Sequence, residues 1–272
     1  MSCKNFLLAP VVVATLGFSG VSAADEAGSA NSHAFGIDFQ SHFVSYGADV
    51  WGAGEDLFGN EHTTFVYMTN EIALSDSLSF NFGAWADVND NAPEDAASVG
   101  GHIQEIDVYG GFGYSAGVFS LSLTYQEWNY GGGTAERIVD VGIGIDDSSA
   151  LGAFSLNPSL TAHSRVGSDA GAEEGTVFVL AIGPGFSAGP LSVSIPVAVG
   201  FVPDEYYDPA SDSGTYFSYG LTGSVPMSFI PAKYGDWSFS AGVIAYSTDA
   251  DSIPGNVEED FTTAYTSIGL GF

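Results

Sequence analysis

Residues 118–126 read VFSLSLTYQ, and this stretch decides the fold class. From Phe119 onward, large apolar residues alternate one by one with serine, threonine and glutamine. Successive side chains of a β-strand point to opposite faces, so this pattern predicts a strand with one apolar face and one polar face. The alternation recurs at residues 78–88 (LSFNFGAWADV) and 191–201 (LSVSIPVAVGF), while helical periodicity is hard to find beyond Phe35. The chain is therefore expected to be all-β.

Twelve segments with this pattern follow one another along the chain. Their predicted spans are 34–44, 63–74, 77–88, 103–115, 118–128, 136–146, 155–166, 175–186, 190–202, 214–227, 236–247 and 260–272. The connections after the second, fourth and eighth segments are tight, whereas those after the first, third, ninth and eleventh are long and mostly acidic. An even strand number with short turns on one side and long loops on the other is typical of outer-membrane barrels. The sequence predicts a transmembrane, antiparallel, up-and-down β-barrel of about 12 strands.

The first residues have the pattern of an export signal. Lys4 supplies a positive start, an apolar stretch covers 6–18, and Val21-Ser22-Ala23 offers a small-residue cleavage site. The apolar stretch is shorter than the about 20 residues that a membrane-spanning helix needs. We therefore expect a cleaved signal peptide at 1–23, a flexible lead-in at 24–34 and the barrel at 35–272.

The last strand carries a second export-related pattern. The chain stops on Phe272, and the alternation places Leu270 and Ile268 on the same face as this terminal aromatic. A terminal aromatic on an alternating strand resembles the signal that the bacterial barrel assembly machinery reads. We expect localisation in the bacterial outer membrane. The expected partners are that machinery, through Phe272, together with outer-membrane lipid and lipopolysaccharide.

Charge excludes one large class of function. The chain has 4 basic and 33 acidic residues, which gives a formal net charge of −29. Nucleic-acid binding rests largely on neutralising phosphates with lysine and arginine, so this class is excluded. The single cysteine, Cys3, lies in the predicted signal, so neither a disulfide framework nor a cysteine-based metal site is expected.

A central block resembles a known family. The stretches EIDVYGGFGYSAGVFSLSLTYQEWNY, ERIVDVGIGID and LNPSLTAHSRV, preceded by LSDSLSFNFGAWADVNDN, resemble the proteobacterial porin family labelled TorF. The resemblance covers about 60–200 and implies an outer-membrane barrel that acts as a channel. Members often carry an aromatic-x-x-Arg-Gly pattern near the first strand. The corresponding VSYGADVWG has no arginine, so no role of that residue is carried over.

The polar faces of the strands supply the candidate site. If the apolar faces meet lipid, the opposite side chains point into the lumen, and rings of carboxylates there favour cations. A passive channel for small hydrophilic solutes, with a preference for cations, is the function we expect. The predicted pore-lining residues are Glu71, Asp87, Glu105, Asp107, Asp140, Trp85, Tyr67 and Arg165.

Other interpretations remain open at this stage. In one alternative the acids are hydrated lumen residues without a role in selectivity. The inward aromatics either stack on a sugar or nucleoside ring or simply fill space. A different class of function is a closed structural or adhesion barrel whose acidic loops bind divalent cations or a partner. A lumen plugged by Phe65, Tyr67, Trp85 and the lead-in would favour that class.

An enzyme is not expected. His163 and Ser164 are adjacent in sequence, so a strand turns them to opposite faces and they cannot form a nucleophile–base pair. His62 and His102 lie near loop acids, but neither belongs to a recognisable catalytic motif. No cofactor and no metal is expected.

Overall fold

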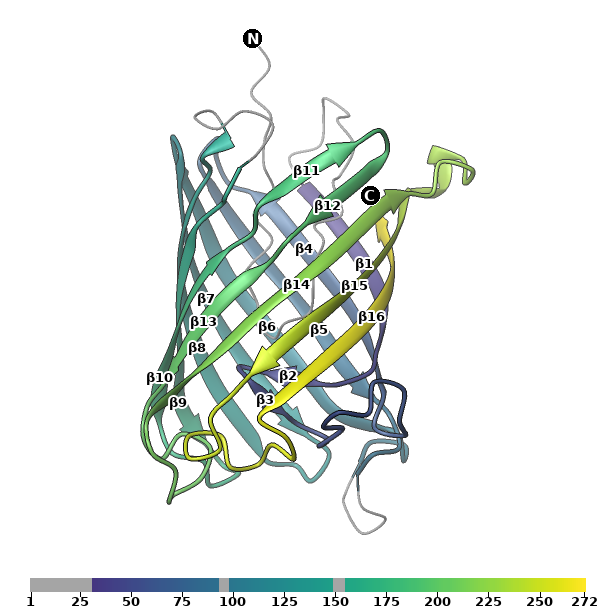
Figure 1. The fold of residues 1–272 in the computed structure, drawn as a ribbon. Coiled ribbons are helices and arrows are strands. Elements are labelled where there is room, and N and C mark those ends of the chain that lie inside the picture. The colour runs from purple at the N-terminus through teal and green to yellow at the C-terminus, as the bar shows by residue number, and fades with distance from the viewer. Residues whose placement is uncertain (1–30, 93–97, 149–154) are drawn as a thin grey trace.

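The computed structural model describes residues 31–92, 98–148 and 155–272, and these form a closed antiparallel barrel of twelve strands. The predicted fold class is thereby confirmed (Figure 1). Ten uninterrupted strands are β1 (Asn31–Gln40), β4 (Thr63–Ala73), β5 (Leu78–Val88), β6 (Ile103–Ala116), β7 (Phe119–Tyr130), β8 (Ala135–Ile145), β9 (Ser159–Ser168), β14 (Gly214–Pro226), β15 (Asp236–Ser247) and β16 (Asp260–Gly271).

Two further barrel strands are each interrupted once by proline. β10 (Gly175–Ile182) continues as β11 (Gly185–Ala188), with Pro184 in the gap. β12 (Leu191–Ser194) continues as β13 (Val197–Val202), with Pro196 in the gap. Proline has no backbone N–H to donate to a neighbouring strand, so the regular ladder is interrupted at each gap. The carbonyl oxygens of Pro184 and Pro196 still accept hydrogen bonds from Ile195 and Gly220, of 2.8 and 2.9 Å.

The barrel closes between the first and last strands. β1 pairs with β4 on one side and with β16 on the other, so that Ile37 lies opposite both Val66 and Ile268. β14 pairs with β15 along ten residue positions and completes the ring. Consecutive barrel strands are neighbours throughout, which is the predicted up-and-down order.

The first strand begins earlier and ends earlier than predicted. β1 starts at Asn31, so 31–34, which were expected in the lead-in, belong to the barrel. The reason is backbone pairing: His33 and Phe272 exchange two hydrogen bonds, of 3.3 and 2.9 Å. The predicted signal peptide and the rest of the lead-in lie outside the described residues and stay predictions.

The outer surface of the barrel carries a continuous apolar belt. It includes Phe35, Phe39, Met68, Val108, Phe112, Leu121, Leu123, Val141, Ile143, Phe178, Leu180, Phe201, Leu221, Val243 and Ile268. So much exposed apolar surface on a closed barrel is a lipid-facing surface. The chain is an outer-membrane β-barrel. No helix in the described part of the chain is long and apolar enough to cross a membrane.

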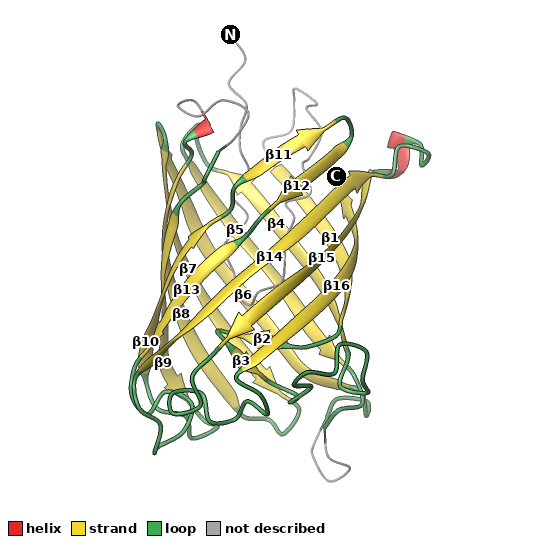
Figure 2. Cartoon of the chain, viewed as in Figure 1, coloured by secondary structure: helices red, strands yellow, loops and turns green. Residues whose placement is uncertain are grey.

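The two ends of the barrel differ in their connections (Figure 2). At the end where Phe272 lies, short turns join β4 to β5, β6 to β7 and β11 to β12; we call it the turn end. The other end, the loop end, carries the connections 41–62, 89–102, 203–213 and 248–259. Outer-membrane barrels have short periplasmic turns and longer extracellular loops, so the loop end faces outward from the cell.

Four inward tyrosines each lie over a glycine on the neighbouring strand. A side chain at any of these glycines would overlap the tyrosine ring, and the register places each pair directly opposite. The pairs are Gly36 with Tyr67, Gly83 with Tyr109, Gly200 with Tyr216, and Gly242 with Tyr265. Glycine in a strand often marks such a close approach, and it lets large rings lie flat against the inner wall.

Candidate functional site: the barrel lumen

The inward side chains divide the lumen into two halves. Towards the turn end they are small and half-buried; β7 and β8, for example, contribute Ser120, Ser122, Gly142 and Gly144. We call this part the turn half. Towards the loop end the same strands contribute large, buried side chains such as Gln126. We call this part the loop half.

Residues 41–62 connect β1 to β4, and their first part, 41–54, enters the loop half; we call the whole connection the lumen segment. Its short hairpin consists of β2 (Val44–Ser45) and β3 (Ala48–Asp49), joined by Tyr46 and Gly47, which both have positive φ. Tyr46 is only 2 % exposed and packs in a cluster that also contains Val177, Val179 and Tyr216 from the barrel wall. The sequence analysis placed 41–44 in the first strand and 45–62 in a long connection, and it did not anticipate the position of the hairpin in the lumen.

The hairpin is held from several sides. The ring of Tyr46 stacks on the imidazole of His163, with 3.7 Å between the ring centroids. Tyr207 donates a hydrogen bond of 2.8 Å to the carbonyl oxygen of Tyr46. Asn256, in the connection before β16, accepts from the N–H of Asp49 at 2.8 Å and donates to the carbonyl of Gly47 at 3.0 Å. Side chains from two other loop-end connections therefore fix the hairpin.

A second group of contacts holds the lumen segment against β4 and β5. The ring of Phe43 meets those of Phe65 and Trp85 edge to face, with centroids 5.1 and 5.6 Å apart. Trp51 donates from its indole nitrogen to Asp87 at 3.0 Å. These residues form an aromatic cluster that also includes Tyr67. The aromatics predicted to line a pore, Tyr67 and Trp85, thus pack against a segment that partly fills it.

Burial changes the acid–base behaviour of the lumen segment. Burial raises the pKa values of Tyr46 and Tyr207 well above their usual range, so both stay neutral phenols. Burial also raises the pKa of Asp49, although the N–H of Gly54 donates to its carboxylate at 2.8 Å. The carboxyl group of Asp49 therefore binds a proton more tightly in the docked segment than it would in water.

The predicted acids lie on one wall of the lumen. Asp87, Glu105 and Asp107 come from β5 and β6, and the register places Asp87 directly opposite Glu105. Asp140 on β8 stands further along the same wall, where it accepts hydrogen bonds from Gln126 and, at 2.7 Å, from His163. Four of the five predicted acids thus gather in the loop half, all of them buried.

The remaining predicted residues do not all join this wall. Glu71 lies near the turn end of β4, half-buried and opposite Asn81, well apart from the other acids along the strand. Arg165 donates from Nε to Glu136 at 2.6 Å and also binds the carbonyl oxygens of Glu173 and Tyr206. Glu136 was not among the predicted site residues, although it shares the inward face of β8 with Ile138 and Asp140.

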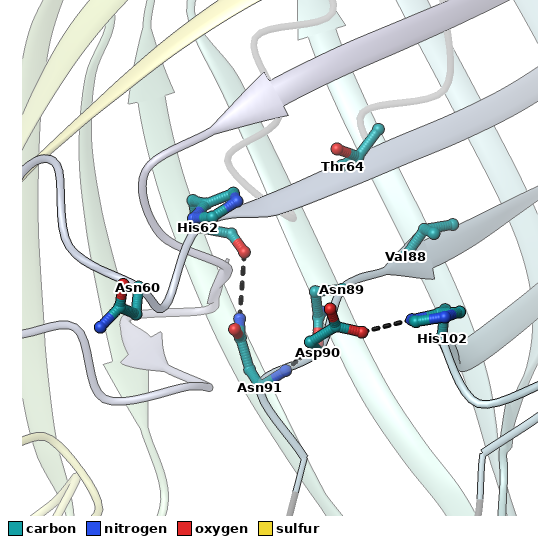
Figure 3. Close-up of a pocket in the computed structure, with 8 residues that line it drawn as sticks. All are labelled: Asn60, His62, Thr64, Val88, Asn89, Asp90, Asn91 and His102. Carbon is teal, nitrogen blue, oxygen red and sulfur yellow. Dashed lines mark hydrogen bonds and ion pairs between the residues drawn. The ribbon is translucent and has the colours of Figure 1, made fainter.

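A polar pocket of about 240 Å³ opens at the loop end, outside this wall (Figure 3). Its lining residues are Asn60, His62, Thr64, Val88, Asn89, Asp90, Asn91 and His102. His102 forms an ion pair with Asp90, and Asn91 is held by the carbonyl oxygens of Glu61 and His62. Both members of the ion pair are largely exposed, so this pair contributes little rigidity.

The histidines named in the sequence analysis occupy separate places. His163 faces inward to Asp140, whereas Ser164 faces the other way and bonds to Thr176 on β10. The two cannot act as a nucleophile and its base, in agreement with the alternation argument. Within the residues that the structure describes, no group of three histidine, cysteine or acidic side chains is arranged to hold a metal ion.

Comparisons with known proteins show no family for this chain. No family model matches, and no curated protein matches by sequence. The translocator domain of autotransporter NalP from Neisseria meningitidis has a TM-score of 0.47 at 12% identity, over 91% of this chain and 90% of that chain. LpxR from Salmonella typhimurium has 0.47 at 9% identity, over 87% and 99%. OccK5 from Pseudomonas aeruginosa has 0.42 at 8%, over 87% and 62%. The resemblance to the TorF-type family stays a prediction.

Proposed function

We propose that the chain is a passive outer-membrane channel for small hydrophilic solutes, with a preference for cations. The charge of the lumen carries this proposal. The inner wall of the loop half holds six buried carboxyl groups, those of Asp38, Asp87, Glu105, Asp107, Glu136 and Asp140, against one guanidinium, that of Arg165. Carboxylates that line a narrow passage attract cations and repel anions.

The turn half supports passage of solutes by its lining. Its inward serines and glycines leave space that large side chains would fill, and interior width increases with strand number. The lumen segment narrows the route at the loop half. We therefore expect a small conductance that is set at the loop half and not along the whole barrel.

The test is a planar-bilayer measurement on refolded protein in a salt gradient. Discrete current steps with a reversal potential on the cation side are expected. Replacing Asp87, Asp107 and Asp140 by Asn and Glu105 by Gln should shift the reversal potential towards zero. Glu71→Gln, at the turn half, should shift it less. An unchanged reversal potential in the multiple variant would contradict the role of these acids.

A specific observation favours a second candidate function, the closed structural or adhesion barrel. Phe65, Tyr67 and Trp85 are buried together with Phe43 of the lumen segment, which is the aromatic part of the plug that this candidate requires. The acidic loops would then bind divalent cations or a partner. A silent bilayer from protein whose folding is verified by heat-modifiable gel mobility would favour this candidate over the channel.

A further inference from the structure

The connection between β14 and β15 is longer than the tight turns at the same end of the barrel. Residues 117–118 and 189–190 suffice to join β6 to β7 and β11 to β12, whereas this connection covers 227–235 and contains the 3₁₀-helix η1 (Ala232–Tyr234). Figure 2 shows η1 projecting sideways beyond the barrel wall. The additional residues therefore extend the outer surface of the barrel and do not cover its lumen.

Gly235 holds this connection against the lipid-facing side of β16. It has a positive φ of 93°, and a Cβ atom at this position would overlap the side chain of Leu270. Leu270 shares the outer face of β16 with Ile268, which belongs to the apolar belt. Trp237 lies opposite Leu270 in the register and donates from its indole nitrogen to the carbonyl oxygen of Tyr234 at 3.0 Å. The connection is therefore continuous with the surface that meets lipid.

Backbone hydrogen bonds give the connection a defined shape. The N–H of Met227 donates to the carbonyl oxygen of Trp237 at 2.8 Å, and that of Ile230 donates to the carbonyl oxygen of Met227 at 2.9 Å. The N–H of Tyr234 donates to the carbonyl oxygen of Pro231 at 3.0 Å. Two consecutive turns therefore hold the side chains of this connection in fixed positions.

The exposed side chains of the connection are those of an interfacial segment. Phe229 is 78 % exposed and Tyr234 is 58 % exposed, so both rings point away from the rest of the protein. Lys233 precedes Tyr234, and its ammonium group lies 4.8 Å from the centroid of the tyrosine ring. Aromatic rings beside a lysine, at the edge of a lipid-facing surface, are typical of segments at the boundary between lipid headgroups and acyl chains.

Lys233 is a rare positive charge in a strongly acidic chain. The chain has 4 basic residues against 33 acidic ones, and three of the four lie in the described ranges. Arg165 faces the lumen and binds Glu136, while Arg137 pairs with Asp169 at the loop end. Lys233, by contrast, is exposed and lies outside the lumen. Among the described residues it is the one lysine or arginine at the turn end.

The turn end faces the periplasm, so the connection lies at the phospholipid leaflet of the outer membrane. We propose that the connection 227–235 is a binding site for the headgroup of an anionic phospholipid. Lys233 donates to the phosphate, the hydroxyl group of Tyr234 offers a further donor, and Phe229 lies among the acyl chains. This inference does not depend on the proposed function, because the connection lies outside the lumen.

The test uses a tryptophan that already lies beside the site. Trp237 shares the outer face of β15 with the exposed Phe239, whereas Trp51, Trp85 and Trp128 pack within the lumen. Lipids with acyl chains brominated close to the headgroup quench only the indoles that they touch. The protein is refolded into phosphatidylcholine vesicles that contain increasing fractions of brominated phosphatidylglycerol or of brominated phosphatidylcholine. Phosphatidylglycerol should quench at an about fivefold lower mole fraction, the effect of one lysine at an anionic surface.

Lys233→Gln should remove this preference, so that both lipids quench alike, because the rings remain and the positive charge is lost. The matched control is Arg137→Gln, which removes one positive charge from an exposed position at the loop end. This control should retain the preference. Equal quenching by both lipids in the unmodified protein, or an unchanged preference in Lys233→Gln, would overturn the inference. Heat-modifiable gel mobility verifies that every variant is folded.

A further variant distinguishes lipid from protein as the occupant of this surface. In Phe229→Trp combined with Trp237→Phe, the indole outside the lumen lies in the connection itself. Brominated lipid should quench it, and its emission should be blue-shifted relative to an indole in water. Emission like that in water would place the connection outside the membrane and reject the site. Protection from both brominated lipid and acrylamide, with a dimeric mass in sedimentation, would assign the surface to a second copy of the chain and reject it as well.

Discussion

The turn half and the loop half of the lumen are formed by the same strands, but the side chains that point inward differ between the two halves. Along β8, for example, Gly142 and Gly144 face the turn half, whereas Glu136, Ile138 and Asp140 face the loop half. The outward face of the same strand is apolar from Val139 to Ile145, and only its loop end carries a charged residue, Arg137. The membrane therefore constrains only one face, and the lumen is free to vary along its length.

This difference indicates which half of the lumen determines the selectivity for solutes. In the turn half the inward groups are small and uncharged for most of the circumference, so solutes meet water and hydroxyl groups. In the loop half the wall acids and the lumen segment leave little free width. A variant in one half should therefore have consequences that the equivalent variant in the other half does not have.

The largest effect is expected from removing the lumen segment. Replacing residues 43–58 by a short glycine–serine linker should raise single-channel conductance several-fold, because the barrel strands stay intact and the obstruction is gone. The measurement is conductance in potassium chloride, with gel mobility as the check on folding. Shortening the turn-end connection 227–235, which lies at the other end of the barrel from the lumen segment, serves as the control. An unchanged conductance would mean that the lumen segment is not the narrowest part.

The second-largest effect is expected from a glycine-to-alanine substitution, which is made once in the loop half and once in the turn half. In Gly200→Ala the new methyl group overlaps the ring of Tyr216, which is buried and surrounded by the Tyr46 cluster. In Gly142→Ala it meets only the Ser122 hydroxyl, which rotates freely. Overpacking costs about 1–3 kcal/mol, whereas an accommodated substitution stays within about 0.5 kcal/mol.

Urea unfolding in lipid vesicles measures both variants. A loss of unfolding free energy in Gly200→Ala, without a comparable loss in Gly142→Ala, would sharpen the contrast between the halves. Equal losses would mean that the ring of Tyr216 has room to move. Tyr216→Leu combined with Gly200→Ala should recover part of the loss, because the clash then disappears.

The barrel strands could be predicted from sequence because lipid imposes a strict alternation. The ends of β4, β5 and β15 lie within one residue of their predicted positions. β1 was displaced because its first residues are small and polar and are held by backbone pairing to Phe272, which alternation cannot detect. Facing was predictable for the same reason as the strands, so Asp107 and Asp140 do point inward.

The lumen segment could not be predicted in this way. Its position depends on contacts with residues far away in the sequence, such as Tyr46 with His163 and Asp49 with Asn256. A usable signal was nevertheless present. Phe43, Tyr46 and Trp51 are too many large aromatics for a hydrated loop, and the glycines among them permit a tight hairpin.

A smaller effect is expected from substituting Asn256, which holds the hairpin by two hydrogen bonds. Asn256→Ala removes the hydrogen bonds to the N–H of Asp49 and the carbonyl of Gly47. A net contribution of about 1 kcal/mol per bond should make the hairpin leave its docked position more often. Single-channel records should show longer open times, at an unchanged conductance of the open level. Asn256→Asp keeps the acceptor and loses the donor, so it should fall between the two.

The smallest effect is a pH dependence that originates in Asp49. Burial raises the pKa of its carboxyl group in the docked segment above the ordinary value of 3.8. His42 lowers it and Glu61 raises it, while the N–H of Gly54 donates to the carboxylate. The docked state then binds a proton more tightly than the undocked state does, so docking weakens as pH rises. This stabilisation is complete below pH 3.8 and is lost as pH rises through the raised pKa.

Lowering the pH from neutral towards 3.8 should therefore keep the segment docked for longer and reduce the open fraction in single-channel records. The wall acids titrate as well, so the unmodified protein alone does not isolate Asp49. Asp49→Asn provides that comparison, because an amide is uncharged at every pH and has nearly the same shape. The variant should show a smaller fall in open fraction over the same pH range. An identical fall in both proteins would place the titrating group on the wall, and the loop half would then sense pH through its carboxylates and not through the segment that covers them.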